Sequence, residues 1–555
     1  MPNSPSEPAG PAPADLAIVG AGPAGLAAAV TAAGLGLRVV VLDAGERPGG
    51  QFYRHPAPGL GAARPEALHH AWPEFATREA ALRAHESAGR ITYLPLHHVW
   101  TVVPGPDAGP ATPAAPVTPA APATPAAPVT PAAPATPAAP ARPAAPATPA
   151  EAAPPAAPAT PAAPQIDAPP PPAPTPRTWT LHAIREAEAA VAVRAGAVLL
   201  ATGAYERQLP FPGWTLPGVV GAGGAQAMLK GGLVLPGRRV VVAGSGPLLL
   251  AVAGSLAAAG AAVPAVVEAA AYTAYAARTP VLLRNPGKLA EAAAYGAALA
   301  RHRVRLLTRH AVTAAHGTGR VEAVTVARLD RDWRPLPGTA RRIPCDALAV
   351  GHGLVPQLEL ATGLGCATRH SPDGTVALDL DAEQRTSVPG IWSAGETGGI
   401  GGAQLALVEG ELAARSIAAA LRGTGGAAPG GNSARRGGRV PGLARTRARL
   451  RAFAGAMAAA HRPGPGWTGW LRDDAVVCRC EEVTAGTIRE AAGELGARDA
   501  RTVKLLTRAG MGWCQGRMCG PAVAALAGGD PAPDRRPLSC PVPLRRLAEL
   551  PPDAP

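Results

Sequence analysis

The 555-residue sequence contains few cysteines, few aromatic residues and almost no lysine. Its seven cysteines are too few and too unevenly spaced to form a disulfide framework. Aromatic residues make up only 3% of the chain, and all but three of the 52 basic residues are arginine. The N-terminus lacks the basic segment and apolar core of a signal peptide, so we expect a cytoplasmic protein.

Long uninterrupted apolar runs are also missing. Two uncharged stretches, residues 16–37 and 240–267, are long enough to span a bilayer. Each contains a Gly-Pro turn near its start, and a turn inside a membrane would leave backbone groups without hydrogen-bond partners. Both stretches are therefore predicted to be buried strand–turn–helix units, and no transmembrane segment is expected.

Proline is abundant but concentrated in one place. Of the 66 prolines, 27 lie in residues 104–176, where T-P-A-A-P-x recurs with four charges and no aromatic side chain. This segment cannot bury enough apolar surface to offset its ordering entropy, so it is predicted to be disordered. The sequences on either side of it, ITYLPLHHVWTVVP and RTWTLHAI, both have the pattern of β-strands, which makes the segment a loop inside a hairpin. The remaining residues, about 480, suffice for three domains and exclude a wholly disordered or collagen-like protein.

The net charge of +13 falls to about +6 without one short arginine-rich segment. Such a run suits nucleic acid, an anionic membrane or an acidic partner. No nucleic-acid-binding motif accompanies it, so we interpret residues 425–469 as a solvated linker and expect no nucleic-acid partner. A non-enzymatic, arginine-rich nucleic-acid-binding protein is the alternative. The seven arginines are Arg435, Arg436, Arg439, Arg445, Arg447, Arg449 and Arg451.

Residues 16–43 carry a dinucleotide-binding fingerprint in its full context of strand, glycine turn, helix and second strand. Gly20 allows the tight turn, Gly22 lets the backbone approach a diphosphate, and Gly25 lets the helix pack closely on the sheet. The helix N-terminus then presents unpaired N–H groups to the diphosphate. Asp43 ends the second strand, where its carboxylate can accept hydrogen bonds from ribose hydroxyls.

Residues 239–268 repeat this pattern less completely. Gly244 and Gly246 match the first two glycines, but Leu249 stands at the third position. Glu268 takes the place of the terminal acid, which favours NAD over NADP if a nucleotide binds. A Rossmann unit that serves only a structural role is the alternative.

Two such units about 220 residues apart suggest that the second domain is inserted into the first. Residues 198–213 and 387–410 support this, because each reads as an apolar strand that runs into a glycine-containing turn. We expect an α/β protein with two nested Rossmann-like dinucleotide-binding domains and a small C-terminal cysteine-ligated helical module. The predicted boundaries are 1–13 for a disordered N-terminus; 14–103, 177–236 and 336–424 for the first domain; 104–176 for the disordered loop; 237–335 for the second domain; 425–469 for the linker; 470–526 for the module; and 527–555 for a tail.

Four cysteines near the C-terminus form a C-x-C pair, a gap of 33 residues and a C-x4-C pair. They are Cys478, Cys480, Cys514 and Cys519. Four convergent thiolates suit a [2Fe–2S] cluster or a structural zinc ion, and the spacing argues against zinc, which commonly uses C-x2-C pairs. A redox-active disulfide between Cys514 and Cys519 is the third possibility.

These motifs together resemble the flavoprotein component of opine oxidases and the larger, flavin-binding component of hydrogen cyanide synthase. Those proteins are similar to pyridine nucleotide-disulphide oxidoreductases and carry a C-terminal domain like bacterioferritin-associated ferredoxin. The C-x4-C spacing here is closer to the opine-oxidase type than to the C-x2-C of that ferredoxin. The residues that carry the resemblance are Gly20–Gly25, Gly49-Gly50-Gln51, residues 201–207 (ATGAYER), Gly395-Glu396, CRCEEV and GMGWCQGRMCG.

The resemblance implies FAD at the first unit, an NAD-type fold at the second, and [2Fe–2S] at the four cysteines. It also implies that Gly50 and Gln51 lie near the flavin, that Val99 meets the adenine, and that the turn at Thr202 and Gly203 lies at the same site. Gly395 and Glu396 would meet the ribityl–phosphate region.

By the same resemblance, the chain would be the electron-transferring subunit of an amine or amino-acid dehydrogenase. Its partners would be an amino-acid-oxidase-like second subunit, together with a small ferredoxin-like one. A self-sufficient NAD(P)H-dependent flavin reductase is the alternative. Disulphide reductases carry a cysteine pair beside the flavin, and residues 205–330 contain no cysteine, which argues against that activity. The sequence assigns no acid–base residue; His352 follows a strand and could face the flavin or be a satisfied loop histidine.

Overall fold

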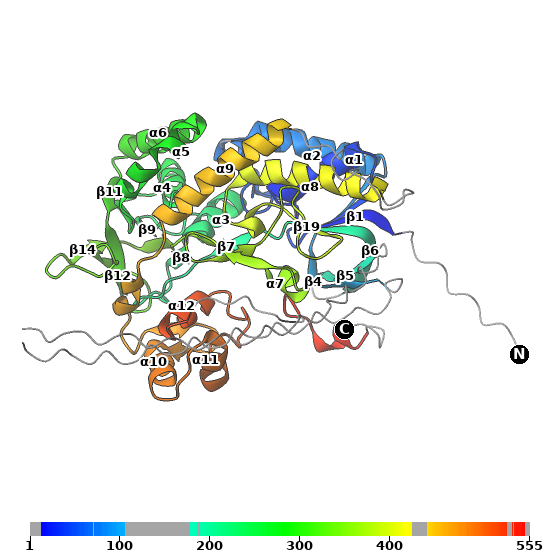
Figure 1. The fold of residues 1–555 in the computed structure, drawn as a ribbon. Coiled ribbons are helices and arrows are strands. Elements are labelled where there is room, and N and C mark those ends of the chain that lie inside the picture. The colour runs from blue at the N-terminus through cyan, green and yellow to red at the C-terminus, as the bar shows by residue number, and fades with distance from the viewer. Residues whose placement is uncertain are drawn as a thin grey trace, which may run out of the picture. The chain divides into compact units, whose positions relative to one another are not determined.

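A computed structural model describes residues 13–69, 71–105, 178–185, 189–423, 441–529, 536 and 538–549 (Figure 1). The predicted disordered ranges 1–13 and 104–176 lie outside these residues except at their ends. Among the described helices, none combines the length and apolar character that crossing a bilayer requires.

The first sheet is built around β1, a central strand that is buried along most of its length. β1 pairs in parallel with β2 on one side and β6 on the other. The strand order is β3-β2-β1-β6-β5-β4, and β19 also pairs with β6. The continuous apolar sequence of β1 matches this position, since strands inside a parallel sheet are covered on both faces. The strands are β1 Ala14–Val19, β2 Val39–Leu42, β3 Ile91–Leu94, β4 His97–Pro104, β5 Trp179–Arg185, β6 Ala189–Leu200 and β19 Ile391–Ser393.

The predicted hairpin around the proline-rich segment is confirmed. β4 and β5 pair in antiparallel register from His97 opposite Arg185 to Pro104 opposite Trp179. The N–H of Gly105 donates to the Thr178 carbonyl, at 2.6 Å, so the two strands stay joined up to the ends of the described residues.

The second sheet has five parallel strands in the order β11-β10-β9-β15-β8. The nested arrangement is therefore present, but the predicted range of 237–335 is too short at both ends. β8 and β15 lie outside it, and sequence separation hides them because each pairs with strands far away in the chain. These strands are β8 Val219–Gly221, β9 Val240–Gly244, β10 Ala265–Glu268, β11 Arg305–Thr308 and β15 Ala347–Gly351.

Four smaller sheets complete the described strands. One has three strands and the others have two. They are formed by β12 His310–His316, β13 Ala323–Arg328 and β14 Arg341–Pro344; by β7 Ala204–Glu206 and β16 Leu354–Pro356; by β17 Thr368–His370 and β18 Val376–Leu378; and by β20 Val476–Cys478 and β21 Val483–Thr484.

The helices that position the sites lie against these sheets. α1 begins at Pro23, a residue suited to the first helical turn, and packs closely on α8, where Gly410 allows the backbones to meet. The α-helices are α1 Pro23–Gly34, α2 Trp72–Ser87, α3 Ala222–Gly232, α4 Leu248–Ala258, α5 Thr279–Leu283, α6 Pro286–Arg301, α7 Glu359–Gly363, α8 Ala403–Gly423, α9 Pro441–Ala460, α10 Ala485–Gly493, α11 Ala500–Thr507, α12 Gly520–Leu526 and α13 Leu544–Leu547.

Helix α9 corrects the prediction of a solvated linker. Residues 441–460 of the range 425–469 form a 20-residue helix that packs on α8 and reaches α5 and the 3-10 helix η3, Tyr272–Arg278 (Figure 1). Its sequence is rich in arginine and alanine, both strong helix formers, and two of its arginines are paired with a buried acid described below. Arg435, Arg436 and Arg439 lie outside the described residues.

Candidate functional site

The first glycine turn follows β1 and has the tight geometry that the fingerprint predicts. Gly20 has φ +104°, and a Cβ there would lie 2.4 Å from the Ala201 carbonyl oxygen. A Cβ on Gly25 would lie 1.8 Å from the Gly20 carbonyl oxygen, so the helix can approach the turn only because Gly25 has no side chain. Gly22 has no atom within 4 Å of its Cβ position and leaves open space at the N-terminus of α1.

Three distant segments meet at this turn. A Cβ on Gly50 would lie 2.9 Å from the Cα of Gly22, and one on Gly395 would lie 3.0 Å from the Cβ of Ala24. The turn at Thr202 and Gly203 follows β6, directly beside β1. The structure thus gathers these predicted site residues at the carboxyl ends of the parallel strands, where ligands bind in open α/β sheets.

Asp43 follows β2 at the same edge of the sheet. Its Oδ2 atom is buried and has no hydrogen-bond partner among the described residues. Burial raises the pKa of the Asp43 carboxyl, although backbone N–H groups of Gly45 and Ala21 oppose this shift. A buried acceptor without a partner is costly, and a ribose hydroxyl is the donor that this position commonly receives.

Three other predicted residues are placed less directly toward a ligand. Gln51 is exposed, and its Oε1 accepts hydrogen bonds from Arg54. The carbonyl of Val99 accepts a 3.0 Å hydrogen bond from the hydroxyl of Ser539, a residue of the predicted tail. Glu396 is turned into its own loop.

The Glu396 carboxylate accepts hydrogen bonds from the N–H groups of Gly401, at 2.6 Å, and Gly402, at 3.0 Å. Burial raises the pKa of this carboxyl, and the two N–H groups oppose the shift. Glu396 therefore shapes the glycine-rich loop, whose backbone contributes to the site.

The second glycine turn has the same backbone but different surroundings. A Cβ on Gly244 would lie 1.7 Å from the Gly351 carbonyl oxygen, so this glycine is required as at Gly20. Gly246 and the whole of Glu268 are buried. The Glu268 carboxylate accepts hydrogen bonds from the N–H groups of Gly246, at 3.0 Å, and Ala270, at 2.9 Å. The predicted ribose-binding acid is thus already paired within its own domain.

The four cysteines come together in a small module of α10, α11, α12 and the β20–β21 ribbon. Cys478 and Cys519 are buried, Cys514 is half-buried and Cys480 is exposed. Burial raises the pKa of the Cys519 thiol, and the neighbouring Cys478 and Cys514 thiols add to the shift. A backbone hydrogen bond from Cys514 lowers the pKa of Cys480, but partial burial and the Cys514 and Cys478 thiols outweigh it.

The donor set of this module is sulfur, arranged as an inner pair, Cys478 with Cys519, and an outer pair, Cys480 with Cys514. In the described part of the chain, no three His, Cys, Asp or Glu side chains are positioned to hold a single metal ion. Two pairs of thiols suit two iron ions better than one tetrahedral zinc ion. Gly512 packs on the outer pair, since a Cβ there would lie 2.2 Å from the Cβ of Cys480.

The cysteine module is bound to the rest of the chain by specific contacts. Arg517, between Cys514 and Cys519, forms a 2.7 Å ion pair with Glu359 of α7. Trp214 donates through Nε1 to the Val476 carbonyl, at 2.6 Å, and the Arg479 guanidinium lies 5.5 Å from the Trp214 ring centre. These contacts attach the module on both sides of the cysteine pairs.

Tyr205 lies in β7, two residues after Gly203, and its strand pairs with β16. Burial raises the pKa of its phenol, and Glu359 and Cys514 act in the same direction, against Arg517 and Arg536. The segment that leaves the first glycine site is therefore the segment that meets the cysteine loop.

His352 is buried against the module and away from the first turn. Its ring lies 6.3 Å from that of Trp333 and 6.2 Å from that of Trp470, and its Nδ1 has no partner among the described residues. Burial lowers the pKa of His352 to about 3, with Arg207 adding to the shift. The imidazole is neutral near pH 7, which fits a buried histidine better than an acid–base group.

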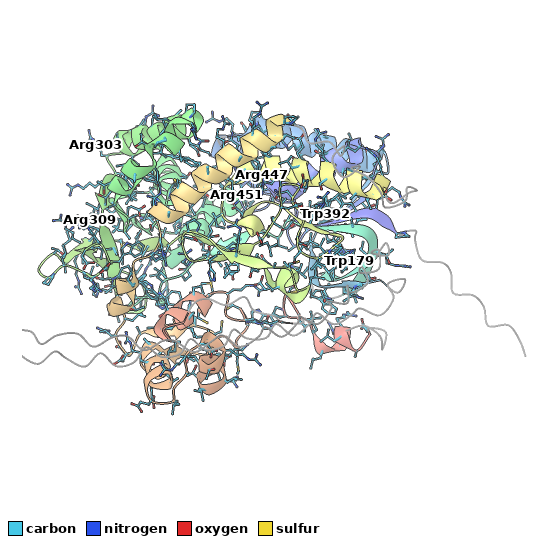
Figure 2. All side chains as sticks on the ribbon, viewed as in Figure 1. Trp179, Arg303, Arg309, Trp392, Arg447 and Arg451 are labelled. Carbon is cyan, nitrogen blue, oxygen red and sulfur yellow. The ribbon has the colours of Figure 1, made fainter. Side chains whose placement is uncertain are left out.

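Several charged residues at the site carry no fingerprint of their own. Glu409 is fully buried in α8, and it binds the N–H of Gly395 at 3.2 Å together with Arg447 and Arg451 of α9 (Figure 2). An acidic residue among apolar helix positions, and two arginines spaced by four, are the only sequence signals of this contact.

Glu206 belongs to the same class of residue. Its carboxylate accepts hydrogen bonds from the N–H groups of Gly223 and Gly224, at the start of α3. Burial raises its pKa, opposed by these N–H groups. It joins the segment after Gly203 to the second domain.

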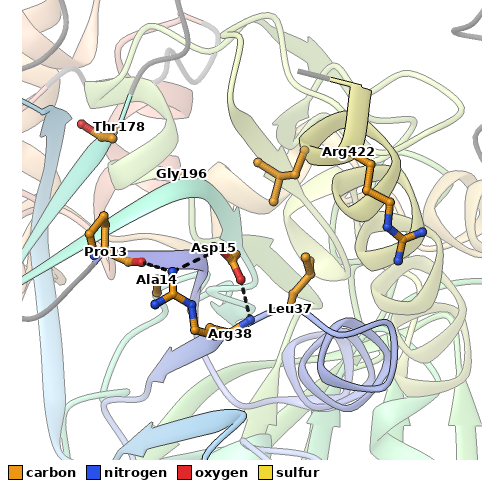
Figure 3. A pocket seen from close by; sticks show the side chains of 9 residues that line it. Pro13, Ala14, Asp15, Leu37, Arg38, Thr178, Gly196 and Arg422 are labelled. Carbon is orange, nitrogen blue, oxygen red and sulfur yellow. Dashed lines mark hydrogen bonds and ion pairs between the residues drawn. The ribbon is translucent and has the colours of Figure 1, made fainter. Parts of the chain in front are cut away.

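A surface pocket at the opposite edge of the first sheet is not part of this site (Figure 3). Asp15 and Arg38 line it, and the Asp15 carboxylate accepts a 2.7 Å hydrogen bond from the Arg38 N–H. It lies at the amino end of β1, whereas Gly20 and Gly22 lie beyond the carboxyl end.

Family models match three parts of the chain. Residues 18–79 match an NAD(P)-binding Rossmann-like domain, residues 179–410 match pyridine nucleotide-disulphide oxidoreductase, and residues 476–527 match a BFD-like [2Fe-2S] binding domain.

Individual relatives extend this match. The HcnB component of hydrogen cyanide synthase from Pseudomonas aeruginosa is 40% identical over 61% of this chain and 71% of its own. The first component of the opine oxidase of Rhizobium meliloti is 31% identical over 92% of this chain and 81% of its own. The chain belongs to the family of these two proteins. The family assignment makes it a flavin-dependent oxidoreductase with a C-terminal BFD-like domain.

A solved structure shows the same fold as this family member. L-proline dehydrogenase from P. horikoshii has a TM-score of 0.54 and 18% identity, over 97% of this chain and 80% of its own. The expected architecture of two Rossmann-like domains and a small helical module is confirmed.

Proposed function

We propose that this chain is the electron-transferring flavoprotein and iron–sulfur subunit of an amine or amino-acid dehydrogenase. It would bind FAD at the first glycine turn and a [2Fe–2S] cluster at the four cysteines. An amino-acid-oxidase-like partner would oxidise an opine-, glycine- or proline-like substrate, and a small ferredoxin-like subunit would complete the complex. The relatives support this assignment, because they are named as subunits of hydrogen cyanide synthase and opine oxidase.

The observation that carries the proposal is the contact between the cysteine loop and the strands that leave the first glycine site. The Arg517–Glu359 ion pair holds the loop beside β7 and β16, immediately after Thr202 and Gly203. An arrangement of this kind serves a protein that moves electrons between two centres of one chain. A module that only stabilised the fold would not require this placement.

The residues of the first site fit FAD. Gly22 leaves room for a diphosphate at the N-terminus of α1, and Asp43 holds a buried acceptor for ribose hydroxyls. Gly50, Thr202, Gly203 and the loop after Gly395 would surround the ring and its chain. Bound FAD supplies the ability to take two electrons together and release them singly.

The residues of the module fit a two-iron cluster in the same way. Cys478 and Cys519 would ligate the buried iron, and Cys480 and Cys514 the outer one. The N–H of Gly510 lies 3.5 Å from the Cys478 sulfur and donates to it, a contact that tunes thiolate ligands in such clusters.

One purification tests both assignments. The chain, isolated without oxygen, should contain about one FAD, two irons and two labile sulfides, as expected for one flavin and one [2Fe–2S] cluster. Its visible absorption should bleach when an amino acid is added together with the partner subunit. Zinc in place of iron, or a colourless chain that binds nucleic acid in a salt-dependent manner, would overturn the proposal.

A further inference from the structure

The second glycine turn is closed by another part of the same chain. His461, which directly follows α9, lies over the turn with its Nδ1 3.1 Å from the Ser245 hydroxyl and 3.5 Å from a Glu268 carboxylate oxygen. Its Nε2 lies 2.6 Å from the Tyr275 hydroxyl. Ser245 stands between the two glycines of the turn, so His461 contacts the turn at its centre.

Tyr275 holds the end of α9 in this position. Its hydroxyl also contacts the sulfur of Met457, at 3.0 Å, one turn before His461 on the same helix. The ring of Tyr272 packs edge-on against the His461 ring at 6.4 Å. The two tyrosines belong to η3, so the second domain provides a receptor for the end of α9.

The two glycine turns of the chain therefore differ in one respect. At the first turn, Gly20, Gly22 and Asp43 keep part of their surface exposed, and Asp43 Oδ2 lacks a partner among the described residues. At the second turn, the corresponding Gly244, Gly246 and Glu268 are all buried. The donors and acceptors that a dinucleotide would use there are already paired, on Glu268 with Gly246 and Ala270.

A small gap remains beside Gly246, where a Cβ would meet no atom within 4 Å. It cannot serve a dinucleotide while His461 bonds to Ser245, because the ribose and diphosphate must reach the same polar groups. Entry of a nucleotide would require breaking the contacts of His461 and leaving Ser245, Tyr275 and Glu268 to find new partners.

The other half of α9 makes displacement still less favourable. Arg447 and Arg451 bind the buried Glu409, so the helix is fixed at both ends. A movement that frees the second turn would also strain a buried ion pair, and breaking such a pair is strongly destabilising.

We propose that His461 and α9 act as a built-in occupant of the second nucleotide site and exclude NAD(P)-type dinucleotides from it. His461 is then a specificity-determining residue, because it makes the chain depend on a partner subunit for electrons and not on a nicotinamide cofactor. This inference deepens the proposed function but stands on contacts that do not involve flavin or iron.

The test is a binding measurement with NADH and with ADP-ribose on the full-length holoprotein, by calorimetry and by nucleotide fluorescence. The unmodified chain should bind neither ligand more tightly than about 1 mM. His461→Ala should open the turn and strengthen binding of ADP-ribose by about tenfold or more. His302→Ala, at an exposed position after α6 in the same domain, should leave binding unchanged.

Tyr275→Phe provides a milder variant, since it removes one hydroxyl and keeps the ring. It should give a smaller gain in the same direction, and hydrogen exchange at Gly246 and Ala270 should quicken in both variants. Micromolar binding of NADH by the unmodified chain would overturn the inference. So would folded His461→Ala and Tyr275→Phe proteins that bind no better than the original. Neither result would affect the FAD, iron and sulfide contents, which test the proposed function separately.

Discussion

Arg451 binds both carboxylate oxygens of Glu409, at 2.6 and 2.7 Å, and so joins α9 to the buried face of α8. Its other nitrogen donates to the Gly399 carbonyl at 2.5 Å, within the loop that begins at Gly395. One arginine therefore fixes both the helix and the glycine-rich loop of the first site.

Removing this arginine should destabilise the protein strongly. Arg451→Ala leaves the buried Glu409 with less compensation, and breaking a buried ion pair costs about 3–5 kcal/mol. The free energy of unfolding, measured with a chemical denaturant, should fall by an amount of this order. Arg449→Ala, at an exposed position on the same helix, is the matched control and should change stability by less than about 0.5 kcal/mol. Equal losses in the two variants would contradict the role given to Arg451.

Replacing Asp43 should weaken FAD binding. Asp43→Ala removes the acceptor for the ribose hydroxyls, and a hydrogen bond to a charged group contributes about 1.5–3 kcal/mol, or roughly a 10- to 150-fold change in affinity. Titration of the apoprotein with FAD measures the change. Asp15→Ala, which alters an aspartate at the opposite edge of the same sheet, should leave the affinity unchanged (Figure 3). An Asp43→Ala protein with undiminished affinity would place the ribose elsewhere.

Acid should destabilise the chain partly through His352. Its folded pKa is lowered to about 3 by burial, while the unfolded histidine titrates near 6.5. Between these values the unfolded state binds more protons, so stability is lost as the pH falls from about 6.5 toward 3. His352→Gln removes this titration, and its unfolding free energy should depend less on pH over that range. Parallel pH profiles of the two proteins would show that His352 is not buried as a neutral group.

The cysteine assignments predict a sharp division among the seven thiols. Cys478→Ser, Cys480→Ser, Cys514→Ser and Cys519→Ser should each lose most of the iron and labile sulfide, since all four ligands complete the cluster. Cys366→Ser, a buried cysteine in the first domain, should keep the full iron content. Iron analysis and absorption spectra give the result directly. Loss of iron from Cys366→Ser, or its retention in two of the four ligand variants, would refute the assignment.

Breaking the Arg517–Glu359 pair should separate electron transfer from cluster assembly. Arg517→Ala frees the cysteine loop from α7, and misplacement of positioned groups by about 1 Å can cost on the order of 100-fold in rate. Reduction of the cluster after adding partner and substrate, followed by stopped-flow absorption, should slow while iron content stays constant. Arg508→Ala breaks an ion pair with Glu481 that is internal to the module and should leave the rate unchanged. A rate unaffected by Arg517→Ala would argue that electrons take another path.

Local patterns predicted the first site well. Gly20, Gly22, Gly25 and Asp43 lie within one strand–turn–helix–strand unit, so their spacing along the chain fixes their arrangement in space. The cysteine pairs were equally legible, because few other roles gather four thiols in 42 residues.

The contacts that close and brace the sites could not be predicted in this way. His461 is 216 positions from Ser245, and Arg447 is 38 positions from Glu409, so no local pattern joins them. The same distance effect hid β8 and β15 from the second domain. An arginine-rich sequence also reads as solvated until the one buried acid that it neutralises is found on another helix.

The joined ends of β4 and β5 have a consequence for how this protein can vary. Because Gly105 and Thr178 are held together by a backbone hydrogen bond, the fold specifies where the proline-rich insert leaves and returns but not how long it is. Closing a longer loop costs only about 0.6 kcal/mol for each doubling in length. The insert can therefore grow, shrink or be exchanged for a foreign domain at almost no expense to the enzyme, which makes this hairpin a natural attachment point.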